Sequence, residues 1–260
     1  ASGSLLDDIM AQARISPVDE GYSVAKQGIA ALVANILDSG NAAEPVNKAL
    51  VDSMIVELDK KLSKQIDVIL HAKELQELES SWRSMKLLVD RTDFRENIKL
   101  LVLHATKEEL LEDFEFAPEI SQSGFYKHVY SSGYGQFGGQ PIGGVIGDYA
   151  LTQSSPDIKL MQYVSAVGAM AHAPFISSVA PTFFGGDRFT DLPTIKDLKS
   201  VFEGPAYTKW RSLRESEDSR YLGLTAPRFL ARLPYDSVEN PIKGFNYKEN
   251  ISASHEHYLW

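Results

Sequence analysis

One stretch of the sequence, residues 74–114, changes its hydrophobic period twice and so restricts the folds that the chain can adopt. In its first part, apolar residues recur three or four positions apart: Leu75, Leu78, Trp82, Met85 and Val89. This spacing predicts one face of an α-helix, on which Trp82 is interpreted as a core residue. The run 98–103 is apolar apart from Lys99, which predicts a strand buried on both faces. Thr106, with Glu109 three residues later, then predicts a capped helix start. Helix, strand and helix in this order predict an α/β layer.

The residues before this stretch are predicted to be helical. Residues 5–14 form a short amphipathic helix, and residues 23–38 carry apolar side chains at helical spacing. Pro45 opens a long helical region whose apolar stripe runs from Val46 to Ile69. We expect a bend at residues 71–72, before the next stripe begins.

The residues after this stretch predict strands alternating with helices. Three further strands are predicted, at residues 141–149, 175–179 and 221–224. Four helices are predicted, at residues 121–132, 154–172, 195–202 and 205–215. The fold class is therefore α/β: an N-terminal helical segment followed by a largely parallel or mixed sheet flanked by helices.

Composition excludes several classes of function. The formal charge of −9 and the pI near 5.2 argue against nucleic-acid binding, because that needs clustered Lys and Arg. The chain has no cysteine, which excludes disulfides, thiolate metal sites and a cysteine nucleophile. No secretory signal is visible, and the most apolar run, residues 28–37, is too short to span a bilayer. We expect a cytoplasmic protein without membrane insertion.

The run Gly133–Gly138 matches the G-x-G-x-x-G pattern of dinucleotide-binding proteins. That pattern needs a strand before the glycines and a helix after them, whereas here a helix precedes and a strand follows. We therefore interpret the glycines as a tight connection and predict no cofactor. The alternative is an α/β enzyme with a cofactor site near Gly133–Gly147.

No other motif indicates catalysis, and we predict no catalytic and no metal-binding residue. His255 and His257 would project to one side of an extended segment, but a metal site would need further ligands. We interpret them as buried or interface histidines. The nucleophile motif G-x-S-x-G and the zinc motif H-E-x-x-H are both absent from the sequence.

Dispersed segments resemble, in the same order, the large sheath subunit of the bacterial type VI secretion system. They are Glu79–Arg83, Leu87–Asp90, Ile98–Leu101, Pro174–Ile176, Phe202–Glu203, Trp210, Arg220–Leu224 and His255–Trp260. The resemblance implies a structural protein that pairs with a small sheath subunit and stacks helically around an inner tube, on a baseplate. It also implies that an AAA+ ATPase disassembles the contracted sheath.

The resemblance also implies partner-binding residues and a longer subunit. The ATPase would bind one face of the first helix, at Leu5, Leu6, Ile9, Met10 and Ala13. The small sheath subunit would bind the long helical stripe, at Leu50, Met54, Leu58 and Leu62. We expect three parts: residues 1–20, a mobile helix and linker; residues 21–94, the segment that pairs with a partner; and residues 95–260, an α/β sheath domain that continues beyond residue 260.

Overall fold

The computed structural model describes residues 23, 26–28, 30, 48–134 and 136–260. The predicted helix at residues 5–14 and most of the predicted helix at 23–38 lie outside these residues. Contacts divide the chain into two units: residues up to 66 with 243–247, and residues 67–242 with 248–260. The predicted boundary at residue 94 rests on a change of hydrophobic period rather than on contacts, and it stays a prediction.

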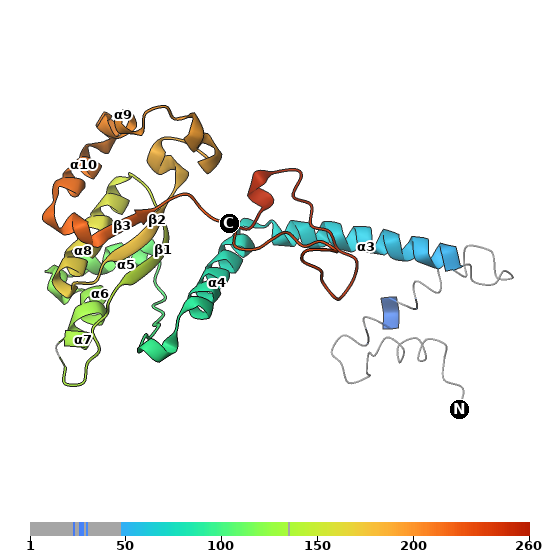
Figure 1. The fold of residues 1–260 in the computed structure, drawn as a ribbon, viewed down its shortest axis with the longest axis horizontal. Helices are drawn as coiled ribbons and strands as arrows, with labels where there is room; N and C mark the ends of the chain where they lie inside the picture. Colours follow the sequence, from blue (N-terminus) through green and yellow to red (C-terminus); the bar gives the residue numbers. More distant parts are fainter. Residues whose placement is uncertain (1–22, 24–25, 29, 31–47, 135) are drawn as a thin grey trace. The chain divides into compact units, whose positions relative to one another are not determined.

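From residue 48 onward the described residues contain eight α-helices, three strands and several short 3₁₀ and π turns (Figure 1). Residues 23, 26–28 and 30 are also helical. The helices are α3 (Lys48–Leu70), α4 (Lys73–Arg91), α5 (Lys107–Phe116), α6 (Gly124–Tyr126), α7 (Ser132–Tyr134), α8 (Ser155–Ala171), α9 (Leu198–Glu203) and α10 (Thr208–Glu215). The strands are β1 (Val145–Leu151), β2 (Phe175–Val179) and β3 (Leu222–Thr225). The π-turn η3 (Lys127–Ser131) joins α6 to α7, and the 3₁₀ turn η7 (Glu217–Tyr221) precedes β3. This arrangement confirms the predicted α/β class.

The predicted helix boundaries agree closely with the structure in the middle of the chain. The long helix ends at Leu70 and α4 begins at Lys73, which confirms the break expected at residues 71–72. The capping box of α5 forms as predicted: the Glu109 N–H donates to the Thr106 side chain, and the Thr106 N–H donates to the Glu109 carboxylate.

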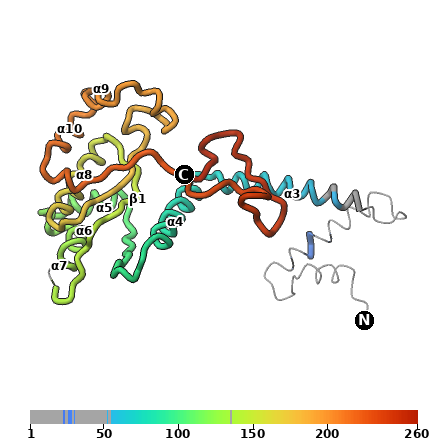
Figure 2. The backbone as a smooth tube through the Cα atoms, viewed as in Figure 1, coloured from blue at the N-terminus to red at the C-terminus, as the bar shows by residue number. Residues whose placement is uncertain are grey.

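The three strands form one parallel sheet in the order β1-β2-β3. The predicted strand at 175–179 matches β2 in full, and the other two differ from β1 and β3 by a few residues at their ends. Ser177 on β2 donates from its hydroxyl to the carbonyls of Gly147 and Tyr149 where the β1–β2 register shifts, and so ties the strands together there. Figure 2 follows the chain from β1 through α8 to β2.

The core lies between one face of the sheet and helix α8. Met161 and Val167 on α8 are fully buried, and Phe175 and Val179 on β2 are nearly so. Helices α5 and α10 and the turn η7 contact α8, so this helix is enclosed by the sheet and by other helices. A helix that is apolar around most of its circumference needs such an enclosed position.

The prediction of a buried strand at 98–103 was wrong. These residues pair with no strand among the residues that the structure describes, and Leu101 and Val102 are 78% and 70% exposed. An apolar run indicates that burial would stabilise a segment. It does not show that other residues of the same chain bury it.

The interpretation of Trp82 as a core residue was also wrong for this chain. Its side chain is 64% exposed, and α4 has no buried residue. Periodicity identifies an apolar face on a helix, but other elements must pack on that face before it becomes core.

The enclosed position of α8 gives a stability prediction. Met161→Ala should lower the free energy of unfolding by about 2–5 kcal/mol, because it removes buried contacts and leaves a cavity. Met170→Ala on the same helix, where the methionine is 40% exposed, should change it by less than about 0.5 kcal/mol. Urea unfolding of both variants measures the difference, and equal losses would contradict this description of the core.

Candidate interaction surfaces

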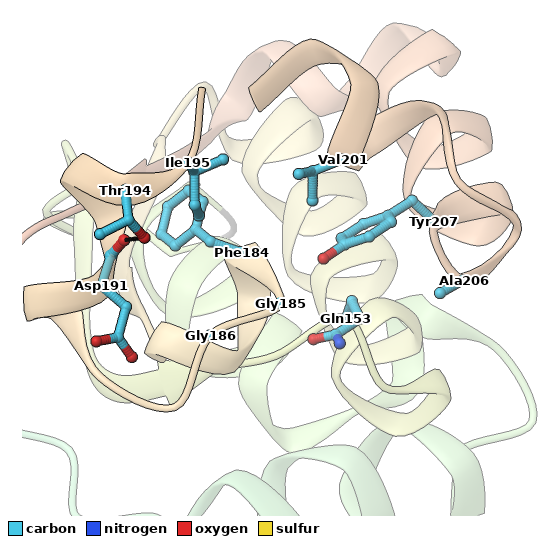
Figure 3. Close-up of a pocket in the computed structure, with 10 residues that line it drawn as sticks. All are labelled: Gln153, Phe184, Gly185, Gly186, Asp191, Thr194, Ile195, Val201, Ala206 and Tyr207. Carbon is cyan, nitrogen blue, oxygen red and sulfur yellow. Dashed lines mark hydrogen bonds between the residues drawn. The ribbon is translucent and has the colours of Figure 1, made fainter. Parts of the chain in front are cut away.

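A pocket of about 550 Å³ opens where β1 and β2 end (Figure 3). Gln153 follows β1 and Phe184 follows β2, so both lie beyond the carboxyl ends of parallel strands. Open α/β sheets commonly bind ligands at this position, which makes the pocket the first candidate for a chemical site.

The chemistry of this pocket does not support catalysis. Its titratable lining residues are Asp191 and Tyr207, which lie on opposite sides of the pocket (Figure 3). The Asp191 carboxylate accepts hydrogen bonds from the Arg188 N–H and the Thr190 hydroxyl. The Tyr207 hydroxyl donates to the Phe183 carbonyl at 3.0 Å, and burial raises its pKa. The pocket therefore holds no paired acid and base.

The glycine-rich run Gly133–Gly138 is part of a tight connection, as predicted. Helix α7 includes its first two residues, Gly133 and Tyr134, and β1 follows it, so a helix comes before the strand, the reverse of the dinucleotide-binding order. A Cβ atom on Gly133 would lie 2.8 Å from the Pro141 Cα, and one on Gly139 would lie 2.5 Å from the Gly133 carbonyl oxygen. Close approach of the backbone to itself accounts for these two glycines.

A buried ion-pair network joins α4 to the last residues of the chain. No pattern in the sequence predicts it. Arg232 binds Glu249 through two hydrogen bonds of 2.6 and 3.1 Å, and binds Glu79 on α4 at 2.9 Å. The side chains of Arg232 and Glu249 are only 5% and 1% exposed. Arg232 also lies over the ring of Tyr235, 4.3 Å from its centroid.

This network is compatible with burial because each charge has several partners. Burial alone would raise the pKa of Glu249, but the hydrogen bonds from Arg232 and from the Tyr235 N–H outweigh it and hold that pKa below its usual value. Burial also opposes the charge of Arg232, but its bonds to Glu249 and Glu79 raise its pKa. A paired and hydrogen-bonded charge is the form in which buried ions are tolerated.

Residues 248–260, here called the C-terminal segment, lie along one face of α4. Gln76 donates to the Glu256 carbonyl at 3.0 Å, and Ser80 donates to the Trp260 carbonyl. The Ala231 N–H donates to the Leu259 carbonyl at 2.8 Å. These bonds place the segment beside the α4 face that carries Gln76, Glu79 and Ser80.

The two histidines of the C-terminal segment are involved in stacking contacts. The His257 ring stacks on His71 with centroids 4.0 Å apart, and the His255 ring stacks on Trp260 at 4.8 Å. His257 is half-buried and His255 exposed. Within the described part of the chain, no group of three or more His, Cys, Asp or Glu residues is placed to hold a metal ion.

The residues predicted to bind partners are only partly within the described structure. Leu5, Leu6, Ile9, Met10 and Ala13 lie outside it, as do the side chains of Leu50 and Met54. Leu58 and Leu62 on α3 are 46% and 44% exposed, next to Ile55 at 50%. An exposed apolar face on a long helix is compatible with a partner that covers it, and the assignment stays a prediction.

Comparison with known proteins identifies the family of the chain. Residues 52–260 match the VipB family model, described as EvpB/VC_A0108, tail sheath N-terminal domain. The chain belongs to this tail-sheath family. It is also 44% identical, over 214 residues, to the type VI secretion system sheath protein TssC1 of Pseudomonas aeruginosa. That match covers 81% of this chain and 43% of the relative, so the chain spans less than half the length of that sheath protein.

The family match agrees with the properties of the surfaces described above. The chain presents exposed apolar faces, and the lining of its pocket holds no paired acid and base. No helix within the described residues is long and apolar enough to cross a membrane.

The ion-pair network predicts a pH-dependent attachment of the C-terminal segment. Glu249→Gln should destabilise this attachment by about 3 kcal/mol at neutral pH, because it leaves Arg232 buried without its main counter-charge. Folding lowers the pKa of Glu249 below its usual value. Ionised Glu249 therefore stabilises the attachment fully at a pH above its usual pKa, and this stabilisation is lost as the pH falls through the lowered pKa of the folded state. The variant should lack this pH dependence.

Amide hydrogen exchange of residues 248–260, corrected for the intrinsic effect of pH, measures the attachment. Glu239→Gln, which neutralises an exposed carboxylate ten positions before Glu249, is the matched control and should leave protection unchanged. Equal protection in both variants would contradict the role of the network.

Proposed function

We propose that this chain is the N-terminal part of the large sheath subunit of a type VI secretion system and has a structural role without catalysis. The observation that carries the proposal is the match of residues 52–260 to the tail sheath N-terminal domain. The identity of 44% to TssC1, a type VI secretion sheath protein, narrows the family to that system. In this role the protein works in the cytoplasm.

The complete subunit pairs with a small sheath subunit, and the heterodimers stack helically around an inner tube on a baseplate. Helix α3 is the proposed contact with the small subunit. Its exposed Leu58 and Leu62 are four residues apart, so they lie one turn apart on one face. Lys60 and Lys64 lie on the opposite face and are exposed as well.

An AAA+ ATPase disassembles the contracted sheath by binding the N-terminal helix. The support is the sequence pattern alone: Leu6, Ile9 and Ala13 recur at helical spacing and form a narrow apolar face. Such a face fits a hydrophobic groove, which is a common mode of peptide recognition.

The α3 contact is tested by introducing negative charges on its apolar face in the complete subunit. The double variant Leu58→Asp with Leu62→Asp should lose at least ten-fold in affinity for the small subunit, because each buried leucine contributes about 1.5–3 kcal/mol. Lys60→Gln with Lys64→Gln changes the formal charge by the same amount on the opposite face and should bind normally. Co-purification and biolayer interferometry measure the difference, and tight binding by the aspartate variant would refute the contact.

The ATPase contact is tested with a peptide that covers residues 1–20, titrated into the N-terminal domain of the ATPase. Leu6→Ala and Ile9→Ala should each weaken binding about ten-fold, since each removes apolar area from the groove. Ala11→Ser, on the opposite face of the helix, is the control and should bind like the wild type. Absence of wild-type binding would reject this contact and leave the sheath assignment in place.

A further inference from the structure

Among the described residues, α8 and the helices in contact with it pack on one face of the sheet. Burial alternates along β2: Phe175, Ser177 and Val179 are buried, whereas Ile176 and Ser178 are exposed. Ile146 pairs with Ile176 across the β1–β2 ladder, and Ile176 pairs with Gly223 across the β2–β3 ladder. These three residues form a row across the sheet on the face opposite α8, here called the open face.

The connections between the strands explain why this face is open. Parallel strands are joined by right-handed crossovers, so strands added in one direction place all their connecting helices on the same face. The order β1-β2-β3 runs in one direction, and the connections α8 and α10 contact each other. Helix α5 also contacts α8. Helices α5, α8 and α10 therefore lie on one side of the sheet.

The open face carries two exposed isoleucines and also Asp148, whose carboxylate accepts a hydrogen bond from the Ser81 hydroxyl on α4. Ile146 is 63% exposed and Ile176 is 41% exposed. Gly223 extends the row without a side chain, and a Cβ atom there would lie 3.4 Å from the Ile176 side chain. The missing side chain at Gly223, beside Ile176, allows another backbone to approach the sheet closely there.

A second exposed apolar segment lies beside the same strand. The Tyr149 hydroxyl on β1 donates to the Ala105 carbonyl at 2.7 Å, and Lys99 donates to the Gln140 side chain at 2.8 Å. These two bonds hold the run 98–103 near β1, which is at the edge of the sheet. Leu101 and Val102 are exposed in this run, so a second apolar surface lies close to the isoleucines of the open face.

We propose that an amphipathic segment of the same subunit, from the part that follows residue 260, covers the open face and the 98–103 run. Parallel sheets occur almost only where both faces are covered, so a stable sheet of this kind requires a second layer. The matched segment is 43% of the length of the relative TssC1, so a subunit of that length has ample chain for such a layer. The inference rests on the proposed function only in that the complete subunit is longer than this chain.

The absence of cysteine from the chain allows a direct test with single-cysteine variants. Ile146→Cys and Ile176→Cys are compared in the 260-residue chain and in the complete large subunit, without the small subunit. Lys199→Cys, whose lysine side chain is 85% exposed, is the accessible control. Ser165→Cys, at a position that is 1% exposed, is the buried control. A maleimide reagent labels the thiols, and mass spectrometry locates each label, so that cysteines elsewhere in the complete subunit are distinguished.

In the 260-residue chain, both open-face cysteines should react at rates close to that of Lys199→Cys. In the complete subunit they should react at least ten-fold more slowly, while both controls keep their rates. Unchanged reactivity in the complete subunit would overturn the proposal. Protection that appears only after the small subunit is added, or only in assembled tubules, would also overturn it, since the cover would then come from a partner or a second copy.

A second measurement avoids substitution of the isoleucines. Hydroxyl-radical footprinting of the wild-type sequences should show Ile146, Ile176 and Leu101 oxidised in the 260-residue chain and protected in the complete subunit. Equal oxidation in the two would contradict the proposal. The outcome is independent of the proposed sheath assembly, because no small subunit or tube protein is present in either sample.

Discussion

The second unit of the structure depends on the burial of one helix, α8, against one face of a parallel sheet. Nine of its seventeen residues are buried, and they lie around most of its circumference. This position fixes the direction in which the strands are added, because each right-handed crossover must return on the α8 side. The same constraint that forms the core therefore leaves Ile146 and Ile176 exposed on the opposite face of the sheet.

A different interaction attaches the end of the chain. Arg232 joins Glu79 and Glu249, which are 170 positions apart in the sequence. It donates one hydrogen bond of 2.9 Å to Glu79 and two, of 2.6 and 3.1 Å, to Glu249. Two charges buried together are stable only with full hydrogen bonding, so this attachment has one well-defined geometry.

The sequence predicted those parts of the fold that depend on neighbouring residues. The capping box at Thr106, the break at residues 71–72 and strand β2 all follow from local spacing. The errors concern residues whose environment is set by distant chain. Trp82 and the run 98–103 are apolar, but the part of the subunit described here does not cover them. Arg232 and Glu249 lie in a region without regular periodicity, and charged residues there are indistinguishable from surface charges by sequence alone. The predicted contacts of Leu58 and Leu62 need a partner chain and stay predictions.

The central claim is that this chain belongs to a subunit that assembles into a contractile sheath. Negative-stain electron microscopy of the complete large subunit, co-expressed with its small sheath subunit, tests that claim most directly. The account predicts hollow tubules that contain both subunits and that do not form when either is omitted. Stable, separately migrating monomers of the two proteins, with no tubules at any concentration, would contradict it.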